Sequence, residues 1–165
     1  MELILRTTNL IDPLSQIWDR LWVGTLVAAL ELQPQNPAGI RAILNCTSEW
    51  MSKPEPFEVT SLHLEDGAPV PPTTVKYAVS RIHEMIKSGP VLICCHAGLS
   101  RSPGIAVAYL TRCGMSWDHA ERVVRYWRPS IQIHPEISLS LRKALGLAPT
   151  AQDSAFNSEF MHKEF

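Results

Sequence analysis

The sequence predicts an α/β fold, with a single central, mixed and mostly parallel β-sheet that is flanked by helices on both faces. Short apolar, β-branched segments alternate with longer segments of helical periodicity, and this alternation is typical of parallel sheets. The clearest case lies at residues 91–110, where an apolar strand-like run leads through a tight loop into an unbroken apolar segment. Residues 72–88 precede it with apolar positions at helical spacing, so a helix there would carry the chain back to the central strand.

The first half of the chain predicts the outer strands of this sheet. Two apolar segments flank the turn residues Asp19 and Arg20, which indicates a hairpin. The indole rings of Trp18 and Trp22 are expected in the core. Prolines stop the next apolar segment, which predicts a short helix, and two β-branched segments follow it. The expected elements are a hairpin over residues 16–23, a helix over 26–32 and strands over 40–45 and 59–64.

The second half predicts helices around the central strand. The amphipathic helix over residues 72–88 has Thr73 or Thr74 as its candidate cap. The helix from 101 to 113 is apolar nearly all round, so it is expected to be buried. Apolar residues at helical spacing mark a last helix over residues 137–145.

A further helix is predicted over residues 116–127, between the buried helix and the last one. Ser116 is a good N-cap for it, and its inward face is expected to include Trp127. Three arginines near its end, Arg122, Arg125 and Arg128, are expected on a solvated face.

The loop after the central strand has the residues of an anion-binding site. Backbone N–H groups of such a loop, and the positive end of the following helix dipole, point at one spot. Cys95 ends the strand and faces these groups, which favours its thiolate form. Arg101 opens the helix, and its planar fork can bind two phosphate oxygens at once. This pair is arranged for in-line attack and a phosphocysteine intermediate, and the Ser102 hydroxyl could ease departure of the sulfur.

Residues 95–102 read Cys-His-Ala-Gly-Leu-Ser-Arg-Ser, which resembles the signature loop of the cysteine-dependent protein phosphatases, closest to the dual-specificity branch. The resemblance covers roughly residues 15–147. It implies a phosphatase-type fold with a strand–phosphate loop–helix active site. The implied phosphate-binding residues are His96, Ala97, Gly98, Leu99, Ser100 and Arg101, and the implied catalytic residues are Cys95, Arg101, Asp66 and Ser102.

Two positions depart from the family pattern. Cys94 stands where the family usually has a histidine just before the nucleophile, which predicts altered tuning of the thiolate and slower turnover or a shifted pH optimum. His134 stands where the family often has asparagine, so the loop-bracing role of that position is not carried over.

A candidate general acid lies on the loop after the strand predicted over residues 59–64. The leaving oxygen of a phosphomonoester needs a proton, which a nearby carboxylic acid can supply before serving as base for the attacking water. Asp66 precedes Cys95 by 29 positions (95 − 66), and the resemblance places its general-acid aspartate about that far upstream. Glu65 is the alternative candidate for this role.

The cysteines suggest redox chemistry rather than metal binding. Cys46 leaves a strand expected beside that of Cys95, so a reversible Cys46–Cys95 disulfide is one expectation, and Cys94 is the second candidate partner. The Cys-x₂-Cys spacing of metal sites is missing, and neighbouring residues on a strand point oppositely. No metal and no cofactor are therefore expected.

The composition is that of an ordinary globular protein. The chain has 165 residues, of which 45% are hydrophobic and 19% charged, with a net charge of −1. Near-neutrality argues against nucleic-acid binding and against a polybasic membrane contact, and no apolar run approaches the ~20 residues of a membrane span. A reactive thiol and an N-terminus without a signal-peptide pattern predict a cytoplasmic location. We expect a catalytic domain over residues 1–147 and a C-terminal tail or extra helix over 148–165.

The implied function is hydrolysis of phosphomonoesters in proteins, on phosphotyrosine and also on phosphoserine and phosphothreonine. Residues 96–100 carry no lysine or arginine, so a phosphoinositide or an RNA 5′-phosphate, the alternative substrates, gains little extra attraction. Two hypotheses compete with this function: a non-catalytic phosphate-binding adaptor (a pseudophosphatase) and a rhodanese-like sulfurtransferase. The presence of Cys95, Arg101, Asp66 and Ser102 together favours the phosphatase.

Overall fold

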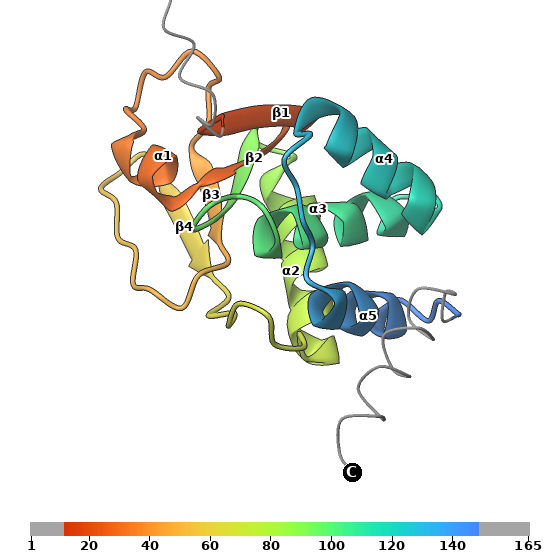
Figure 1. The fold of residues 1–165 in the computed structure, drawn as a ribbon. Helices are drawn as coiled ribbons and strands as arrows, with labels where there is room; N and C mark the ends of the chain where they lie inside the picture. Colours follow the sequence, from red (N-terminus) through yellow and green to blue (C-terminus); the bar gives the residue numbers. More distant parts are fainter. Residues whose placement is uncertain (1–11, 149–165) are drawn as a thin grey trace, which may run out of the picture.

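The computed structural model describes residues 12–148, which form a five-stranded sheet with helices on both faces (Figure 1). The strand order is β1-β2-β5-β3-β4. β1 runs antiparallel to β2, and the remaining neighbours are parallel, so the predicted mixed, mostly parallel sheet is confirmed. The strands are β1 (Leu14–Trp18), β2 (Leu21–Thr25), β3 (Ala42–Asn45), β4 (Glu58–Ser61) and β5 (Val91–Cys95).

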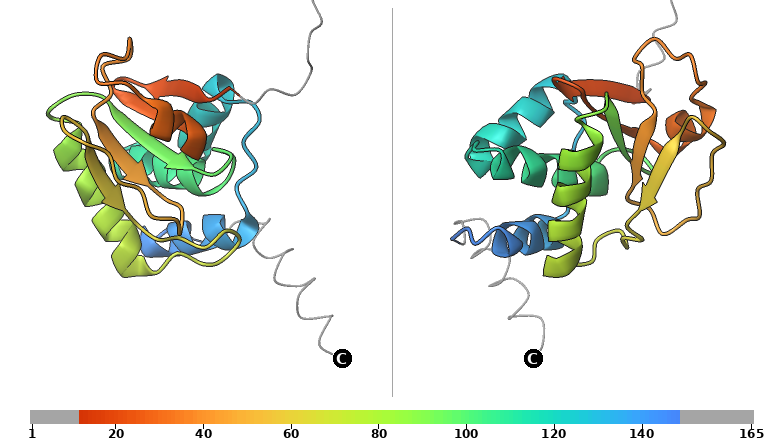
Figure 2. Two further views of the ribbon diagram at one scale, coloured as in Figure 1. Left: turned by 90° about the vertical axis from the view of Figure 1, so that its left-hand side faces the viewer. Right: turned by 180° about the vertical axis from the view of Figure 1, so that it is seen from behind.

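The helices divide unequally between the two faces (Figure 2). The short helix α1 covers one face, and the other four cover the opposite one. Because successive residues of a strand face opposite sides, Ile93 and Cys95 of β5 belong to the core under the four helices, and Leu92 and Cys94 to the core under α1. The helices are α1 (Leu26–Glu31), α2 (Pro72–Met85), α3 (Arg101–Arg112), α4 (Trp117–Trp127) and α5 (Pro135–Ala144).

Most expected elements are present, with some local differences. Ser116 caps α4 as predicted, through a hydrogen bond from the N–H of His119. The threonine cap expected for α2 is wrong, because Pro71 holds the N-cap position and no side chain caps the helix. β4 is shorter than the expected strand and starts one residue earlier.

Two tryptophans expected in the core lie largely at the surface instead. The side chains of Trp18 on β1 and Trp127 on α4 are 46% and 55% exposed. β1 is the edge strand of the sheet, and Trp127 is in the last turn of α4, so both residues lie at the margin of their elements. Within residues 12–148, no helix is both long and apolar enough to cross a membrane.

The parallel strands place the functional loops at one edge of the sheet. Asn45 of β3 lies beside Cys94 of β5, and the N–H of Cys46 donates to the Cys94 carbonyl at 2.8 Å. The segments that follow β3 and β5 therefore leave the sheet together. Open α/β sheets bind their ligands at this carboxyl edge.

Candidate active site

The loop over residues 96–100, here called the phosphate loop, joins β5 to α3 with its carbonyl groups turned outward. These carbonyls accept hydrogen bonds from the surrounding protein. Because a peptide unit is planar and trans, an outward carbonyl turns the next N–H group inward. The bonds are Leu26 N–H to His96 O (3.3 Å), the Arg128 guanidinium to Ala97 O (3.2 Å) and Gly98 O (2.7 Å), and Gln132 N–H to Leu99 O (2.7 Å).

Cys95 lies at the floor of this loop as the last residue of β5. Its Sγ forms a hydrogen bond with Ser102 Oγ at 3.1 Å. Burial, with a further contribution from Cys95, raises the pKa of Cys94 to about 12, and burial also raises the pKa of Cys46 well above its ordinary value. Both neighbours therefore stay protonated near neutral pH, and Cys95 is the thiol that faces the loop.

Arg101 is the first residue of α3, and its side chain is only 6% exposed. One Nη donates to the carbonyl of Leu64 at 3.0 Å, which fixes the guanidinium beneath the loop that follows β4. Its Nε lies 3.9 Å from Oδ1 of Asp66, whose side chain is 68% exposed. Arg101 thus connects the phosphate loop to the candidate general acid.

A pocket of about 410 Å³ opens where these groups meet. Asp66 lines it and Glu65 does not, so the geometry favours Asp66 over its sequence neighbour. Gly98 faces Arg128 instead of the pocket, and Ser102 is buried behind Cys95. The lining residues are Asp66, Cys95, His96, Ala97, Leu99, Ser100, Arg101, Gln132, Ile133, His134 and Pro135.

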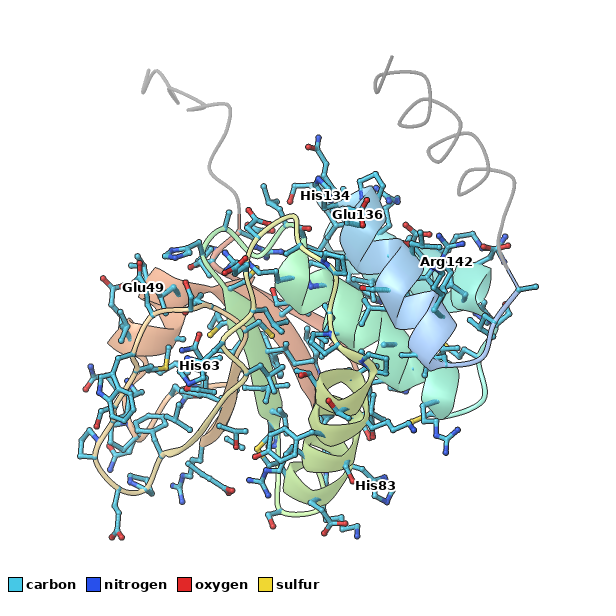
Figure 3. The ribbon with its side chains drawn as sticks, turned by 90° about the horizontal axis from the view of Figure 1, so that it is seen from below. Glu49, His63, His83, His134, Glu136 and Arg142 are labelled. Carbon is cyan, nitrogen blue, oxygen red and sulfur yellow. The ribbon has the colours of Figure 1, made fainter. Side chains whose placement is uncertain are left out.

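His134 lies between the two functional loops, at the start of α5 (Figure 3). Its backbone N–H donates to Ser100 Oγ at 2.9 Å, and its Nδ1 accepts the N–H of Glu136. A Cβ added at Gly67, beside Asp66, would lie 3.4 Å from His134 Nε2. His134 therefore binds the phosphate loop and lies close to the loop of Asp66, at the position where the family often has asparagine.

The opposite rim of the pocket carries a second histidine. His96 Nε2 lies 3.2 Å from Oε1 of Glu49, which projects from the segment after β3 (Figure 3). The sequence indicated neither this pair nor the contributions of Gln132 and Ile133, because each depends on loops that are distant along the chain.

Arg128 is the main correction to the expected site. It was expected on a solvated face with Arg122 and Arg125, but it is 1% exposed and donates to the phosphate loop. The turn after Trp127 directs it inward, because Arg128 already has non-helical dihedral angles. The spacing of Arg128 along the predicted helix did not indicate that its side chain is buried.

The two candidate redox partners of Cys95 lie on different faces of the sheet. Cys46 shares the core of Cys95, whereas Cys94 belongs to the core under α1. Within residues 12–148, no three His, Cys, Asp or Glu side chains gather closely enough to hold a metal ion.

Comparison with known proteins agrees with this geometry. The family model of the dual specificity phosphatase catalytic domain matches residues 21–144. The protein-tyrosine-phosphatase MKP1 of Arabidopsis thaliana is 32% identical over 118 residues, which cover 67% of this chain but only 15% of that protein.

Solved structures share the fold along most of the chain. Human DUSP28 superposes with a TM-score of 0.73 at 23% identity, covering 80% of this chain and 92% of that one. A mouse protein assigned as a dual specificity phosphatase and complexed with zinc tungstate superposes with a TM-score of 0.71 at 25% identity, covering 80% and 86%. The chain therefore belongs to the dual-specificity phosphatase family, whose catalytic domain it carries over residues 21–144.

Proposed function

We propose that this protein hydrolyses phosphomonoesters of phosphorylated proteins through a phosphocysteine intermediate at Cys95. The observation that carries the proposal is the convergence of Cys95, Arg101 and Asp66 on one pocket, with the amide groups of the phosphate loop around it. A thiolate nucleophile, a bidentate cation and a carboxylic acid are what phosphoryl transfer to sulfur requires.

In the first step, the Cys95 thiolate attacks phosphorus from the side opposite the leaving group. The S–P bond forms while the P–O bond to the substrate breaks. Asp66 donates its proton to the leaving oxygen, so the alcohol or phenol departs neutral. Arg101 and the inward N–H groups stabilise the charge on the three equatorial oxygens.

In the second step, Asp66 acts as the base. It takes a proton from water, the water oxygen attacks phosphorus, and the P–S bond breaks to release inorganic phosphate. Ser102 donates a hydrogen bond to the departing sulfur, since its Oγ lies 3.1 Å from Sγ. The cycle restores both the thiolate and the protonated acid without a metal or cofactor.

The pocket supports a protein phosphomonoester as the substrate. Arg101 is the only lysine or arginine among its lining residues in the part of the chain that the structure describes, so a headgroup or RNA end with several phosphates has no further fixed cation to bind. The mouse relative was solved with tungstate, a tetrahedral oxyanion like phosphate. We propose phosphotyrosine, with phosphoserine and phosphothreonine, as the substrates.

The test is hydrolysis of p-nitrophenyl phosphate by the wild type and by Cys95→Ser, with Cys113→Ser as the control because Cys113 is exposed and outside this pocket. We expect Cys95→Ser to abolish turnover and Cys113→Ser to leave it unchanged. If the wild type is no faster than Cys95→Ser, the non-catalytic adaptor replaces the enzyme. A panel of phosphotyrosine, phosphothreonine, phosphoinositide and 5′-triphosphate RNA then ranks the candidate substrates, and thiosulfate turnover tests sulfur transfer.

We further propose a cytoplasmic location, since the thiolate requires a reducing compartment. The catalytic domain is proposed to span residues 1–147, of which 12–147 are described. The proposed tail over 148–165 lies outside the described residues except for Ala148. The match covers only 15% of the length of the Arabidopsis relative.

A further inference from the structure

Arg128 is a buried cation whose partners are not carboxylates. Its side chain is among the largest that are fully buried, and no ion pair joins it to an Asp or Glu within residues 12–148. Burying an unpaired charge is costly unless its donors are satisfied. The guanidinium donates four hydrogen bonds, and their acceptors identify the segments that Arg128 holds in place.

The four acceptors come from two separate segments. Nε and one Nη donate to Gly98 O (2.7 Å) and Ala97 O (3.2 Å) in the phosphate loop. The other Nη donates to the Asp12 carbonyl (2.6 Å) and to Ser15 Oγ (2.8 Å) at the start of β1. The planar guanidinium has five N–H donors and can donate to all four acceptors at once, which a lysine ammonium with three donors cannot do.

The phosphate loop is shaped to fit this guanidinium. Gly98 has a φ of +64°, a conformation that favours glycine. A Cβ at this position would lie 2.5 Å from an Arg128 Nη and 2.9 Å from the carbonyl oxygen of Gly24. No other residue fits there while Arg128 stays in place, so the glycine and the arginine form one unit.

We propose that Arg128 is a positioning residue for phosphoryl transfer, holding the Ala97 and Gly98 carbonyls outward so that the following N–H groups face the phosphate, with its charge behind Cys95. This proposal rests on the proposed function and deepens it. Arg128 does not touch the phosphate: it acts through the peptide groups that do.

The charges around Cys95 are consistent with this role. Burial lowers the pKa of Arg128, while Cys95 and then Asp12 act in the opposite direction. The interaction between Arg128 and Cys95 is therefore attractive when both groups are charged, and Arg128→Gln removes it. The other groups near Cys95 are Arg101 with Asp66, the protonated thiols of Cys46 and Cys94, and His96 with Glu49 at the rim.

Two substitutions separate the charge from the geometry. Arg128→Lys keeps the charge and loses the fork, and Arg128→Gln loses both. Arg122→Gln is the matched control, because Arg122 is an exposed arginine on α4. The readouts are kcat and KM for p-nitrophenyl phosphate as a function of pH, the rate of Cys95 alkylation by iodoacetamide as a function of pH, and the rise in Tm caused by tungstate.

For Arg128→Lys we expect kcat to fall about a hundredfold, the weak end of the effect of losing one oxyanion donor, while the fall of kcat/KM at acidic pH stays at the same pH as in the wild type. For Arg128→Gln we expect a larger fall in kcat, and the loss of activity at acidic pH should begin at a higher pH than in the wild type. Alkylation of Cys95 at pH 6 should be slower, and tungstate should no longer raise Tm. A purely structural role predicts a lower Tm without these changes in pH dependence.

The proposal is overturned if both variants fold and keep kcat, the pH curves and the tungstate response of the wild type. If neither variant folds, Ser15→Ala tests the proposal instead, because it removes one hydrogen-bond acceptor of the Arg128 guanidinium and leaves the phosphate loop unchanged. An unchanged kcat and pH profile in Ser15→Ala would overturn the proposal. If the wild type binds tungstate in an Arg128-dependent way but hydrolyses nothing, the proposed function fails, while the role of Arg128 in shaping the phosphate loop for an oxyanion stands.

Discussion

At the scale of single residues, the proposed acid–base chemistry depends on Asp66. We predict that Asp66→Asn lowers kcat for p-nitrophenyl phosphate by roughly a hundredfold or more, because the amide can neither give a proton to the leaving oxygen nor take one from the attacking water. Glu65→Gln is the control, since Glu65 does not line the pocket, and its kcat should stay within about twofold of the wild type. If Glu65→Gln lowers kcat more than Asp66→Asn does, Glu65 is the general acid and Asp66 is not.

A second residue-scale prediction concerns Cys46. Strands in a sheet lie about 4.8 Å apart, and Cys46 follows Asn45, the β3 partner of Cys94, so it comes beside Cys95 on the same face. Peroxide should convert the Cys95 thiolate to a sulfenic acid, and the Cys46 sulfur should then displace hydroxide to form a disulfide. Because burial raises the pKa of Cys46, and attack requires its thiolate, closure should accelerate as pH rises.

Peptide mapping of peroxide-treated protein measures this disulfide. Cys94→Ser should still form the Cys46–Cys95 bond, since Cys94 lies on the other face, and Cys46→Ser should leave Cys95 open to irreversible oxidation. A Cys94–Cys95 bond, or over-oxidised Cys95 in the wild type, would contradict the assignment.

Three of the four residues proposed to carry the chemistry could be predicted because they lie in one contiguous stretch, whereas Asp66 depended on the family resemblance. Cys95 ends β5, and Arg101 and Ser102 begin α3 directly after the phosphate loop. Arg128, Gln132 and Glu49 were not predictable from local pattern, because their roles arise from contacts between segments far apart in the sequence. Trp18 shows the same limit, since its exposure depends on β1 being the sheet edge.

At the scale of elements, α4 matters because its end directs Arg128 into the molecule. Its N-cap is Ser116, whose Oγ accepts the N–H of His119 at 3.2 Å. Hydrophobic periodicity and capping residues predicted α4 well, while β4 is limited to the four residues that pair with β3, and α2 ends at Met85 instead of residue 88.

We predict that Ser116→Ala lowers the free energy of unfolding by about 1 kcal/mol, through loss of that cap. Urea denaturation measures it. Ser130→Ala is the control, because Ser130 is an exposed turn residue that caps no helix, and its change should stay within about 0.5 kcal/mol. Equal losses in both variants would mean that the cap contributes nothing.

At the scale of the whole molecule, the site is assembled from four connections. These are the segments after β3, β4 and β5, and the link from α4 to α5. A larger cavity of about 600 Å³ between α2, α3 and α5 contains neither Cys95 nor Arg101, so the chemistry of the lining, not the volume, identifies the site. The mixed, mostly parallel character of the sheet could be predicted from the strand–helix alternation, but neither its full strand order nor the meeting of these four connections could be.

The proposed domain boundary gives a prediction at this scale. All residues that line the site lie between positions 49 and 135, and the two described core clusters lie within residues 12–148. A chain that ends at residue 148 should therefore keep kcat/KM for p-nitrophenyl phosphate within about twofold of the full chain. A tenfold loss would place the remaining residues in the catalytic domain.

The central claim is that phosphate passes through the sulfur of residue 95. The most direct measurement is peptide mapping by mass spectrometry after Asp66→Asn, mixed with p-nitrophenyl phosphate, is rapidly denatured during turnover. The account predicts a phosphoryl group on Cys95, and none in the double variant Cys95→Ser, Asp66→Asn. The intermediate accumulates because p-nitrophenolate is a weak base that leaves with little help from the acid, whereas hydrolysis of the intermediate lacks its base. Phosphate on a different side chain, or turnover with Cys95 unmodified, would contradict it.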